Sequence, residues 1–192
     1  MIRSEIGGSP DMEEIRDRIQ RIKMLMMDVD GVMTDGGLLL GTGGMELKRF
    51  HVQDGMGITL ARAAGLRIGI LTGRSSEAVR KRAEELRIDE VQQGFFHKEE
   101  GYERILGKYG LKDEEVAYIG DDVLDVPILK RVGLSICVAN GTEEARSVAH
   151  YITERNGGDG AVREVVELLL KEMGKKEEVL GILLNRSKEG KQ

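Results

Sequence analysis

The feature that most constrains the fold is a regular alternation of apolar runs and helical stretches along residues 22–174. Nearly continuous apolar runs, typical of strands buried on both faces, occur in "IKMLMMDVDG", "LRIGILTG", "EEVAYIGDD" and "LSICVA". Stretches with helical spacing, such as "SSEAVRKRAEELR" and "KEEGYERILGKYG", separate them. Strands and helices that alternate through short loops form a parallel sheet, and right-handed crossovers cover both of its faces. We therefore predict an α/β fold with a doubly wound parallel sheet.

One segment interrupts the alternation. In "GLLLGTGGMELKRFHV", two short apolar stretches flank a glycine-rich turn, which predicts a β-hairpin. Isoleucines at helical spacing predict a further helix over residues 11–23. The expected organisation is an N-terminal helical extension at 1–22, the α/β domain at 23–172 and a C-terminal tail at 173–192.

Composition narrows the function classes. The net charge of the 192-residue chain is −5, which disfavours nucleic-acid binding, because that function normally requires a clustered basic patch. Its apolar runs are shorter than the roughly 20 residues that span a bilayer, and its N-terminal segment lacks the apolar stretch of a signal peptide. We expect no membrane partner and a cytoplasmic location. Cys137 stands in an apolar run and is predicted to be a buried thiol.

Polar side chains follow each predicted strand, where the carboxyl ends of a parallel sheet share one edge. In chain order they are Asp28, Asp30 and Asp35, then Thr72, Gly73 and Arg74, then Lys98, then Asp121, Asp122 and Asp125, then Asn140. Carboxylates gathered in this way repel one another unless a cation neutralises them. Hard oxygen ligands without histidine or cysteine suit Mg²⁺, which commonly leaves positions open for a phosphate oxygen.

Phosphoryl transfer is the reaction that this set predicts. Asp28 is the candidate nucleophile, because a carboxylate attacking phosphorus gives an aspartyl-phosphate. Asp30 is placed two residues on, on the same side of an extended segment, to protonate the leaving oxygen and then activate water. Thr72, Lys98 and backbone N–H groups of the first loop are expected to stabilise the transferred group.

Four motifs carry a resemblance to a known family. "DVDGVMTDG", "TGR", the lysine in "FHKEE" and "GDDVLD" resemble, in order and spacing, the motifs of the haloacid dehalogenase superfamily of phosphohydrolases. The resemblance covers roughly residues 23–170. Longer stretches, "FHVQDGMGI", "YIGDDVLDVPILKRVGLS" and "GGDGAVREV" among them, are similar to the 3-deoxy-D-manno-octulosonate 8-phosphate phosphatase family, a capless, tetrameric branch.

The resemblance implies a Rossmann-like core and a role for each motif residue. Asp28 is the nucleophile and a magnesium ligand, and Asp30 is the acid/base, which binds the metal through its carbonyl. Asp121 completes the metal site and Asp122 supports it. The phosphoryl group is held by Thr72, Gly73 and Lys98. Arg74 has two open interpretations: it binds the substrate carboxylate, or it forms a salt bridge to a helix.

Neither the interval from Asp28 to Thr72 nor the interval from Thr72 to Lys98 has room for a cap domain. In the family the hairpin assembles a tetramer, so that neighbouring subunits cover each site. The apolar hairpin side chains that would form this interface are Leu38, Leu39, Leu40, Met45 and Leu47. The alternative is that they pack on their own domain. The tail either enters a neighbouring site or is a frayed terminus.

Three acidic residues have plainer interpretations. Asp54 is expected to be the N-cap of the helix that follows the hairpin, and Asp35 and Asp125 are expected to hold loops. The family commonly has an acidic residue at the position of Asn140 and a basic residue at the position of Asp159. These two departures affect the expected substrate more than the expected phosphoryl-transfer chemistry.

The predicted activity is hydrolysis of 3-deoxy-D-manno-octulosonate 8-phosphate in lipopolysaccharide sugar biosynthesis. A nine-carbon keto-sugar acid phosphate is the alternative substrate, and a non-catalytic assembly module is the alternative role. A phospho-receiver domain uses similar residues, but its acid pair comes early and its phosphorylated Asp follows the third strand. The order of motifs here therefore favours the hydrolase.

Overall fold

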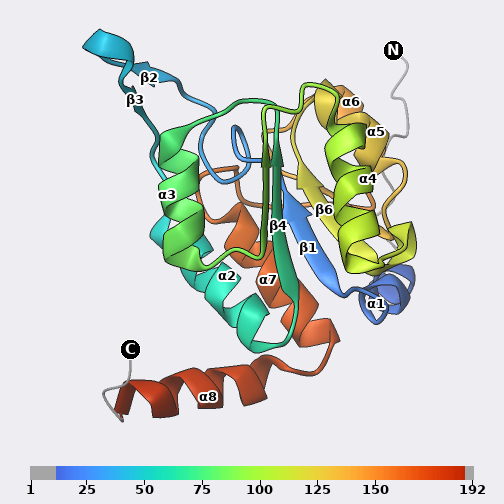
Figure 1. The fold of residues 1–192 in the computed structure, drawn as a ribbon. Coiled ribbons are helices and arrows are strands. Elements are labelled where there is room, and N and C mark those ends of the chain that lie inside the picture. Colours follow the sequence, from blue (N-terminus) through green and yellow to red (C-terminus); the bar gives the residue numbers. More distant parts are fainter. Residues whose placement is uncertain (1–11, 189–192) are drawn as a thin grey trace, which may run out of the picture.

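A six-stranded sheet lies at the centre of the computed structural model, which describes residues 12–188 (Figure 1). Its order is β5-β4-β1-β6-β7-β8, and every pairing in it is parallel. The strands are β1 (Met24–Met27), β4 (Arg67–Thr72), β5 (Glu90–Gln93), β6 (Val116–Gly120), β7 (Leu134–Cys137) and β8 (Tyr151–Ile152). The predicted doubly wound parallel sheet is confirmed.

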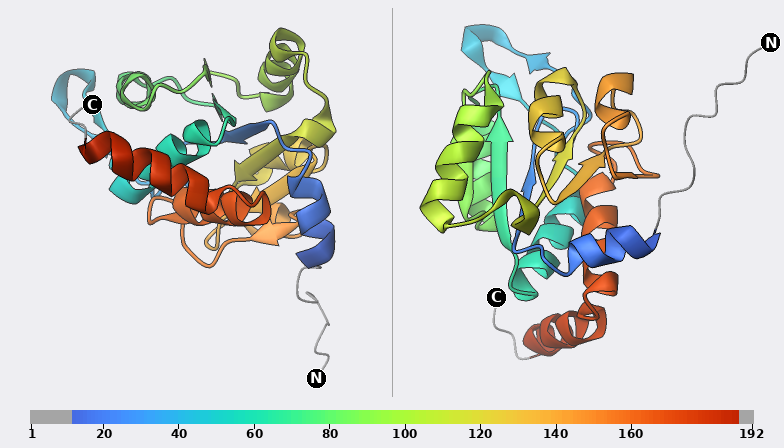
Figure 2. Two further views of the ribbon diagram at one scale, coloured as in Figure 1. Left: turned by 90° about the horizontal axis from the view of Figure 1, so that it is seen from below. Right: turned by 90° about the vertical axis from the view of Figure 1, so that its right-hand side faces the viewer.

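Helices cover both faces of the sheet (Figure 2). One face packs on α1 (Met12–Ile19), α2 (Val52–Ala63), α3 (Glu77–Leu86), α7 (Ala161–Glu172) and α8 (Lys176–Lys188). The other packs on α4 (Lys98–Tyr109), α5 (Val126–Leu129) and α6 (Glu143–Arg146). Successive side chains of β1 alternate between these two cores, which is why its sequence is apolar throughout. None of the helices described is long and apolar enough to cross a membrane.

The predicted hairpin is present. It consists of β2 (Leu39–Leu40) and β3 (Glu46–Leu47), joined by a turn at Thr42–Gly44. It projects from the carboxyl end of the sheet, away from α8 (Figure 1). The five apolar side chains named above are between 49% and 71% exposed, so they do not pack on their own domain. Between β1 and α4 the chain adds only the hairpin, α2, β4, α3 and β5, and no cap domain.

The two ends of the described chain pack on the domain. Ile15 and Ile19 of α1 are buried in the core, and the helix ends at Ile19, earlier than the expected residue 23. The predicted extension before residue 12 lies outside the described residues. In the tail, Val179 of α8 is 1% exposed and packs into the same core. This part of the tail is therefore an ordered helix rather than a frayed end.

The expectation that Asp54 is the N-cap of α2 is wrong. The N-cap position is His51, and Asp54 lies inside the first turn. Its Oδ1 accepts a hydrogen bond from the backbone N–H of Arg163, 2.8 Å away in the first turn of α7. Asp54 therefore caps a neighbouring helix, because α2 and α7 pack against each other. Burial raises the pKa of this carboxyl.

Close backbone contacts hold together the loops at the carboxyl edge of the sheet. The N–H of Gly158, after β8, donates to the carbonyl of Val32, after β1, at 2.9 Å. The N–H of Gly157 donates to Oδ1 of Asn140, after β7, at 2.9 Å. A Cβ atom on Gly157 would lie only 1.6 Å from the carbonyl oxygen of Gly31, so no other residue fits there without displacing the first loop.

Two glycine-to-alanine substitutions are expected to change the free energy of unfolding in opposite directions. Gly157→Ala should lower the free energy of unfolding by about 1–3 kcal/mol, because the methyl group overlaps backbone. Gly107→Ala, within α4 and with open space around its Cβ position, should raise it by about 0.5–1 kcal/mol. Denaturant unfolding measures both. Equal stability of Gly157→Ala and the unmodified protein would contradict the close approach.

Candidate active site

The register of the sheet places Asp28 and Asp121 side by side. Met27 pairs with Ile119, and the backbone N–H of Asp28 donates to the carbonyl of Ile119 at 3.0 Å. Each carboxylate therefore follows the end of one of two adjacent strands. On the other side of β1, β4 ends at Thr72, which is buried. Three predicted site residues thus lie at one edge, as parallel topology requires.

A buried lysine forms the centre of the site. Lys98 is the first residue of α4, and its Nζ lies 2.7 Å from Oδ2 of Asp28 and 2.5 Å from Oδ1 of Asp125. Lys98 is 3% exposed and Asp125 is fully buried. The hydroxyl of Tyr118, from β6, donates to the same oxygen of Asp125 at 2.6 Å. A buried charge is stable only when paired in this way.

Asp125 uses its second oxygen to hold a loop. Oδ2 accepts the backbone N–H groups of Asp121 and Asp122, at 3.0 Å and 3.2 Å. This is the loop-holding role expected of Asp125. Asp122 is exposed, and its Oδ1 accepts the N–H of Val123 at 2.7 Å to cap a short 3₁₀ turn. The structure thus gives Asp122 a capping contact, and its support of a metal stays a prediction.

Among the described residues, Asp28, Asp121 and Asp125 each offer a carboxylate oxygen within 4.8 Å of the others. Both oxygens of Asp125 already accept hydrogen bonds, whereas Oδ1 of Asp121 is buried without a hydrogen-bond partner. A Cβ atom on Gly31 would lie 2.0 Å from Oδ2 of Asp121, so glycine keeps this carboxylate uncovered by a side chain. A buried carboxylate oxygen without a hydrogen-bond partner, beside Asp28, fits a small divalent cation.

The electrostatics of the site also favour a cation. Burial raises the pKa of Asp121 to about 8, and the charges of Asp125 and Asp28 add to the effect. Burial raises the pKa of Asp28 to about 6, although Lys98 opposes it. For Lys98 itself, burial lowers the pKa, but the two carboxylates in contact with it outweigh burial and raise it overall. One ammonium group therefore does not neutralise the cluster.

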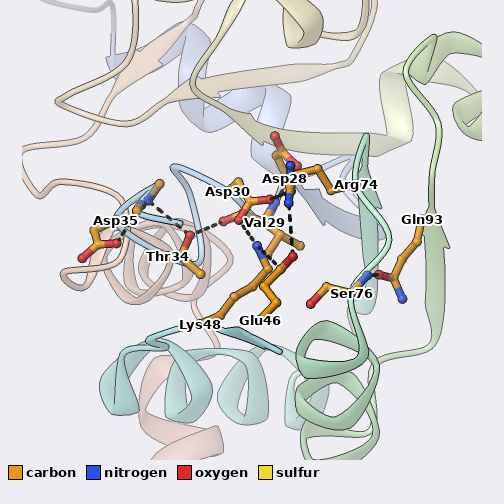
Figure 3. A network of polar contacts seen from close by, with 12 residues as sticks. Asp28, Val29, Asp30, Thr34, Asp35, Glu46, Lys48, Arg74, Ser76 and Gln93 are labelled. Carbon is orange, nitrogen blue, oxygen red and sulfur yellow. Dashed lines mark hydrogen bonds and ion pairs between the residues drawn. The ribbon is translucent and has the colours of Figure 1, made fainter. Parts of the chain in front are cut away.

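The side chain of Asp30 is directed toward Lys48 of the hairpin and toward Arg74 (Figure 3). Its Oδ1 forms an ion pair with Nζ of Lys48, and its Oδ2 lies 3.8 Å from Nε of Arg74. Glu46 pairs with both cations, at 3.2 Å from Lys48 and 3.1 Å from Arg74. The salt-bridge partners of Arg74 thus lie on the hairpin and the first loop, and not on a helix.

Glu46 and Lys48 were not predicted from the sequence to belong to the site. Their only signal is the alternation in "MELK", where charged residues occupy every second position of a short strand. Tyr118 was not predicted either; it is a tyrosine within a strand buried on both faces, and its hydroxyl requires a partner.

The remaining candidates have structural contacts. Gly73 follows Thr72 directly, and a Cβ atom there would meet only the carbonyl of Phe95 and its neighbour, at 3.7 Å or more. Asp35 accepts the N–H of Gly37 at 3.0 Å and pairs with Arg49 at 2.7 Å, which is the expected loop-holding role. Cys137 is buried, as expected, and burial raises the pKa of its thiol to about 12.

Comparison with known proteins agrees with this geometry. Residues 90–165 match the family model for haloacid dehalogenase-like hydrolases. The chain is 40% identical over 172 residues to 3-deoxy-D-manno-octulosonate 8-phosphate phosphatase KdsC of Escherichia coli K12, covering 90% of this chain and 92% of the relative.

Two solved structures are also similar. The 3-deoxy-D-manno-octulosonate 8-phosphate phosphatase of Yersinia pestis has a TM-score of 0.84 at 41% identity, covering 86% of this chain and 89% of that one. The Moraxella catarrhalis enzyme, in complex with magnesium, phosphate and KDO, has a TM-score of 0.87 at 40% identity, covering 90% and 99%. The chain therefore belongs to the 3-deoxy-D-manno-octulosonate 8-phosphate phosphatase family of the haloacid dehalogenase superfamily.

Proposed function

We propose that the protein is a magnesium-dependent phosphatase that hydrolyses 3-deoxy-D-manno-octulosonate 8-phosphate through an aspartyl-phosphate on Asp28. The observation that carries the proposal is the pairing of Asp28 with buried Lys98 beside the unpartnered carboxylate of Asp121. The Moraxella catarrhalis relative, solved with magnesium, phosphate and KDO, supports both the cofactor and the substrate class.

The residues present fit a magnesium ion. Asp28 and Asp121 would hold it with their carboxylates, and Asp30 with its backbone carbonyl, as the family resemblance implies. Magnesium supplies charge neutralisation for the carboxylates and for the oxygens of the transferred phosphoryl group. Asp122 would support this site from the adjacent turn.

Each step of the reaction is assigned to a residue of this chain. A carboxylate oxygen of Asp28 attacks phosphorus, and the bond from phosphorus to the sugar oxygen breaks as Asp30 donates its proton to that oxygen. Asp30 then takes a proton from a water molecule that attacks the same phosphorus, which releases phosphate and restores Asp28. Lys98, Thr72 and the backbone at Gly73 orient the phosphoryl oxygens.

Arg74 is the candidate for recognition of the sugar acid. Its guanidinium is about half exposed at the mouth of the site, where it could bind the substrate carboxylate bidentately after exchanging its contact with Glu46.

A nine-carbon keto-sugar acid phosphate remains the second candidate substrate. The ion pair of Asp28 with buried Lys98, beside the carboxylates of Asp121 and Asp125, opposes a non-catalytic role. A cytoplasmic location is part of the proposal, in keeping with a single cysteine that forms no intrachain disulfide.

We also propose a homotetramer assembled through the hairpin. The exposed leucines and methionine at 38–40, 45 and 47 form an apolar surface larger than single scattered side chains would give. A lone sheet edge is open to water, and a neighbouring subunit seated on the hairpin would cover it.

The first test is turnover with magnesium. Asp28→Asn should lower kcat at least about 10³-fold, because the amide cannot attack phosphorus. Asp35→Asn, at an exposed acid on the same edge, should stay within about twofold of the unmodified enzyme. Phosphate release is measured on an eight-carbon and a nine-carbon sugar-acid phosphate and on p-nitrophenyl phosphate, with the highest kcat/KM expected for the eight-carbon substrate. Full activity of Asp28→Asn would refute the nucleophile.

The second test follows magnesium affinity against pH. Folding raises the pKa of Asp121 from 3.8 to about 8, so between these pH values the folded chain holds a proton that the unfolded chain has released. In the metal-free protein the free energy of unfolding therefore falls as the pH rises from 3.8 to about 8. A cation must displace the proton, so affinity should fall about tenfold per pH unit below 8. Calorimetric titration at pH 6.5 and 8.5 measures it, with Asp121→Asn as control. Equal affinities would contradict the assignment.

The third test is oligomeric state. Light scattering should give the mass of four chains for the unmodified protein and a smaller species for Leu40→Lys, because a charge in an apolar interface is left unpaired. Met12→Lys, at an exposed methionine on α1, should leave the mass unchanged. A monomeric mass for the unmodified protein would refute the tetramer.

A further inference from the structure

Strand β3 and the residues flanking it, 45–48, present two different faces. Met45 and Leu47 are each 55% exposed, whereas the side chain of Glu46, between them, is 19% exposed and that of Lys48, after Leu47, is 1% exposed. This is the period-two alternation of an extended strand, with apolar side chains outward and charged side chains inward. An ammonium group buried at the end of a two-stranded hairpin requires an explanation, because burying a charge without a partner is costly.

The explanation lies in a closed ring of four charges, which we define as Asp30, Lys48, Glu46 and Arg74 (Figure 3). Lys48 pairs with Oδ1 of Asp30 and lies 3.2 Å from Oε1 of Glu46. Nη2 of Arg74 donates to Oε2 of Glu46 at 3.1 Å. The ring closes where Nε of Arg74 lies 3.8 Å from Oδ2 of Asp30. Opposite charges alternate around it, so each side chain fixes two others.

The two carboxylate oxygens of Asp30 have different contacts within the ring. Oδ1 accepts a direct contact from the buried ammonium group of Lys48. Oδ2 is 3.8 Å from Arg74, which is beyond hydrogen-bond distance. Lys48 therefore restricts the rotation of the Asp30 carboxylate while leaving one oxygen able to exchange a proton with another group.

We propose that Lys48, supported by Glu46, is a positioning residue for the acid/base step, an inference that rests on the proposed function. Lys48 holds Oδ1 of Asp30 so that Oδ2 donates the proton to the departing sugar oxygen and later takes one from water. Neither Lys48 nor Glu46 touches the reacting atoms. A group that must be held in one orientation loses rate when its support is removed, even if it remains present.

The choice of leaving group separates positioning from general structural support. A sugar alkoxide needs a proton to depart, whereas p-nitrophenolate is stable and departs without one. Lys48→Met should therefore lower kcat/KM for the sugar-acid phosphate about tenfold or more, and that for p-nitrophenyl phosphate less than about threefold. Lys48→Arg, which keeps the charge, should recover most of the loss. Equal losses on both substrates would overturn the proposal, and so would no loss on the sugar-acid phosphate.

Glu46→Gln provides a second variant that keeps the shape of the ring. It should weaken the contact with Lys48 and lower kcat/KM for the sugar-acid phosphate by less than Lys48→Met does, again with little effect on p-nitrophenyl phosphate. An equal loss of kcat/KM on both substrates would count against the proposal, even if Lys48→Met does not fold. The matched control is Arg49→Met, which removes the adjacent cation paired with Asp35 and should change neither substrate more than about twofold.

The unmodified enzyme is assayed first, and the alkyl phosphate that it hydrolyses best is used for the variants. Failure of the proposed function would appear there, as absence of turnover on every phosphate. Failure of the present inference would appear only in the ratio of kcat/KM between the two leaving groups. The two failures are therefore distinguishable.

Discussion

The repulsion between buried carboxylates at one sheet edge is the constraint on which the site depends. Asp28 and Asp121 end neighbouring strands, and burial raises the pKa of both. Lys98 neutralises only part of this charge, since it is shared between Asp28 and Asp125. Tyr118 and the backbone of the following loop hold Asp125 in place. The fold thus maintains an arrangement that a divalent cation stabilises, which is what phosphoryl transfer from a dianionic ester requires.

In the proposed enzyme the hairpin links this chemistry to assembly. Its outward face is apolar and exposed, while its inward face brings Glu46 and Lys48 to Asp30. A subunit that covers the outward face would restrict the hairpin and, through it, the charged ring that includes Arg74. In the proposed enzyme, closing the site against water and orienting the acid/base would therefore result from the same contact.

How far the sequence predicts this structure depends on the range of the contacts. Strand ends of a parallel sheet must meet at one edge, so the gathering of Asp28 and Asp121 follows from the order of elements alone. The cap formed by Asp54 depends on α2 packing beside α7, and local sequence assigns it to its own helix instead. The contact of Lys48 with Asp30 requires the hairpin to fold over the first loop, which no local pattern specifies.

The proposed catalysis depends on a covalent bond between Asp28 and phosphorus. The most direct measurement is to quench the enzyme during turnover, reduce it with borohydride and map the product by peptide mass spectrometry. Reduction of an aspartyl-phosphate cleaves its acyl bond and converts the residue to homoserine. We expect homoserine at position 28 only when substrate and magnesium are both present. Modification at another acidic residue, or unmodified Asp28 in an enzyme that is turning over substrate, would contradict it.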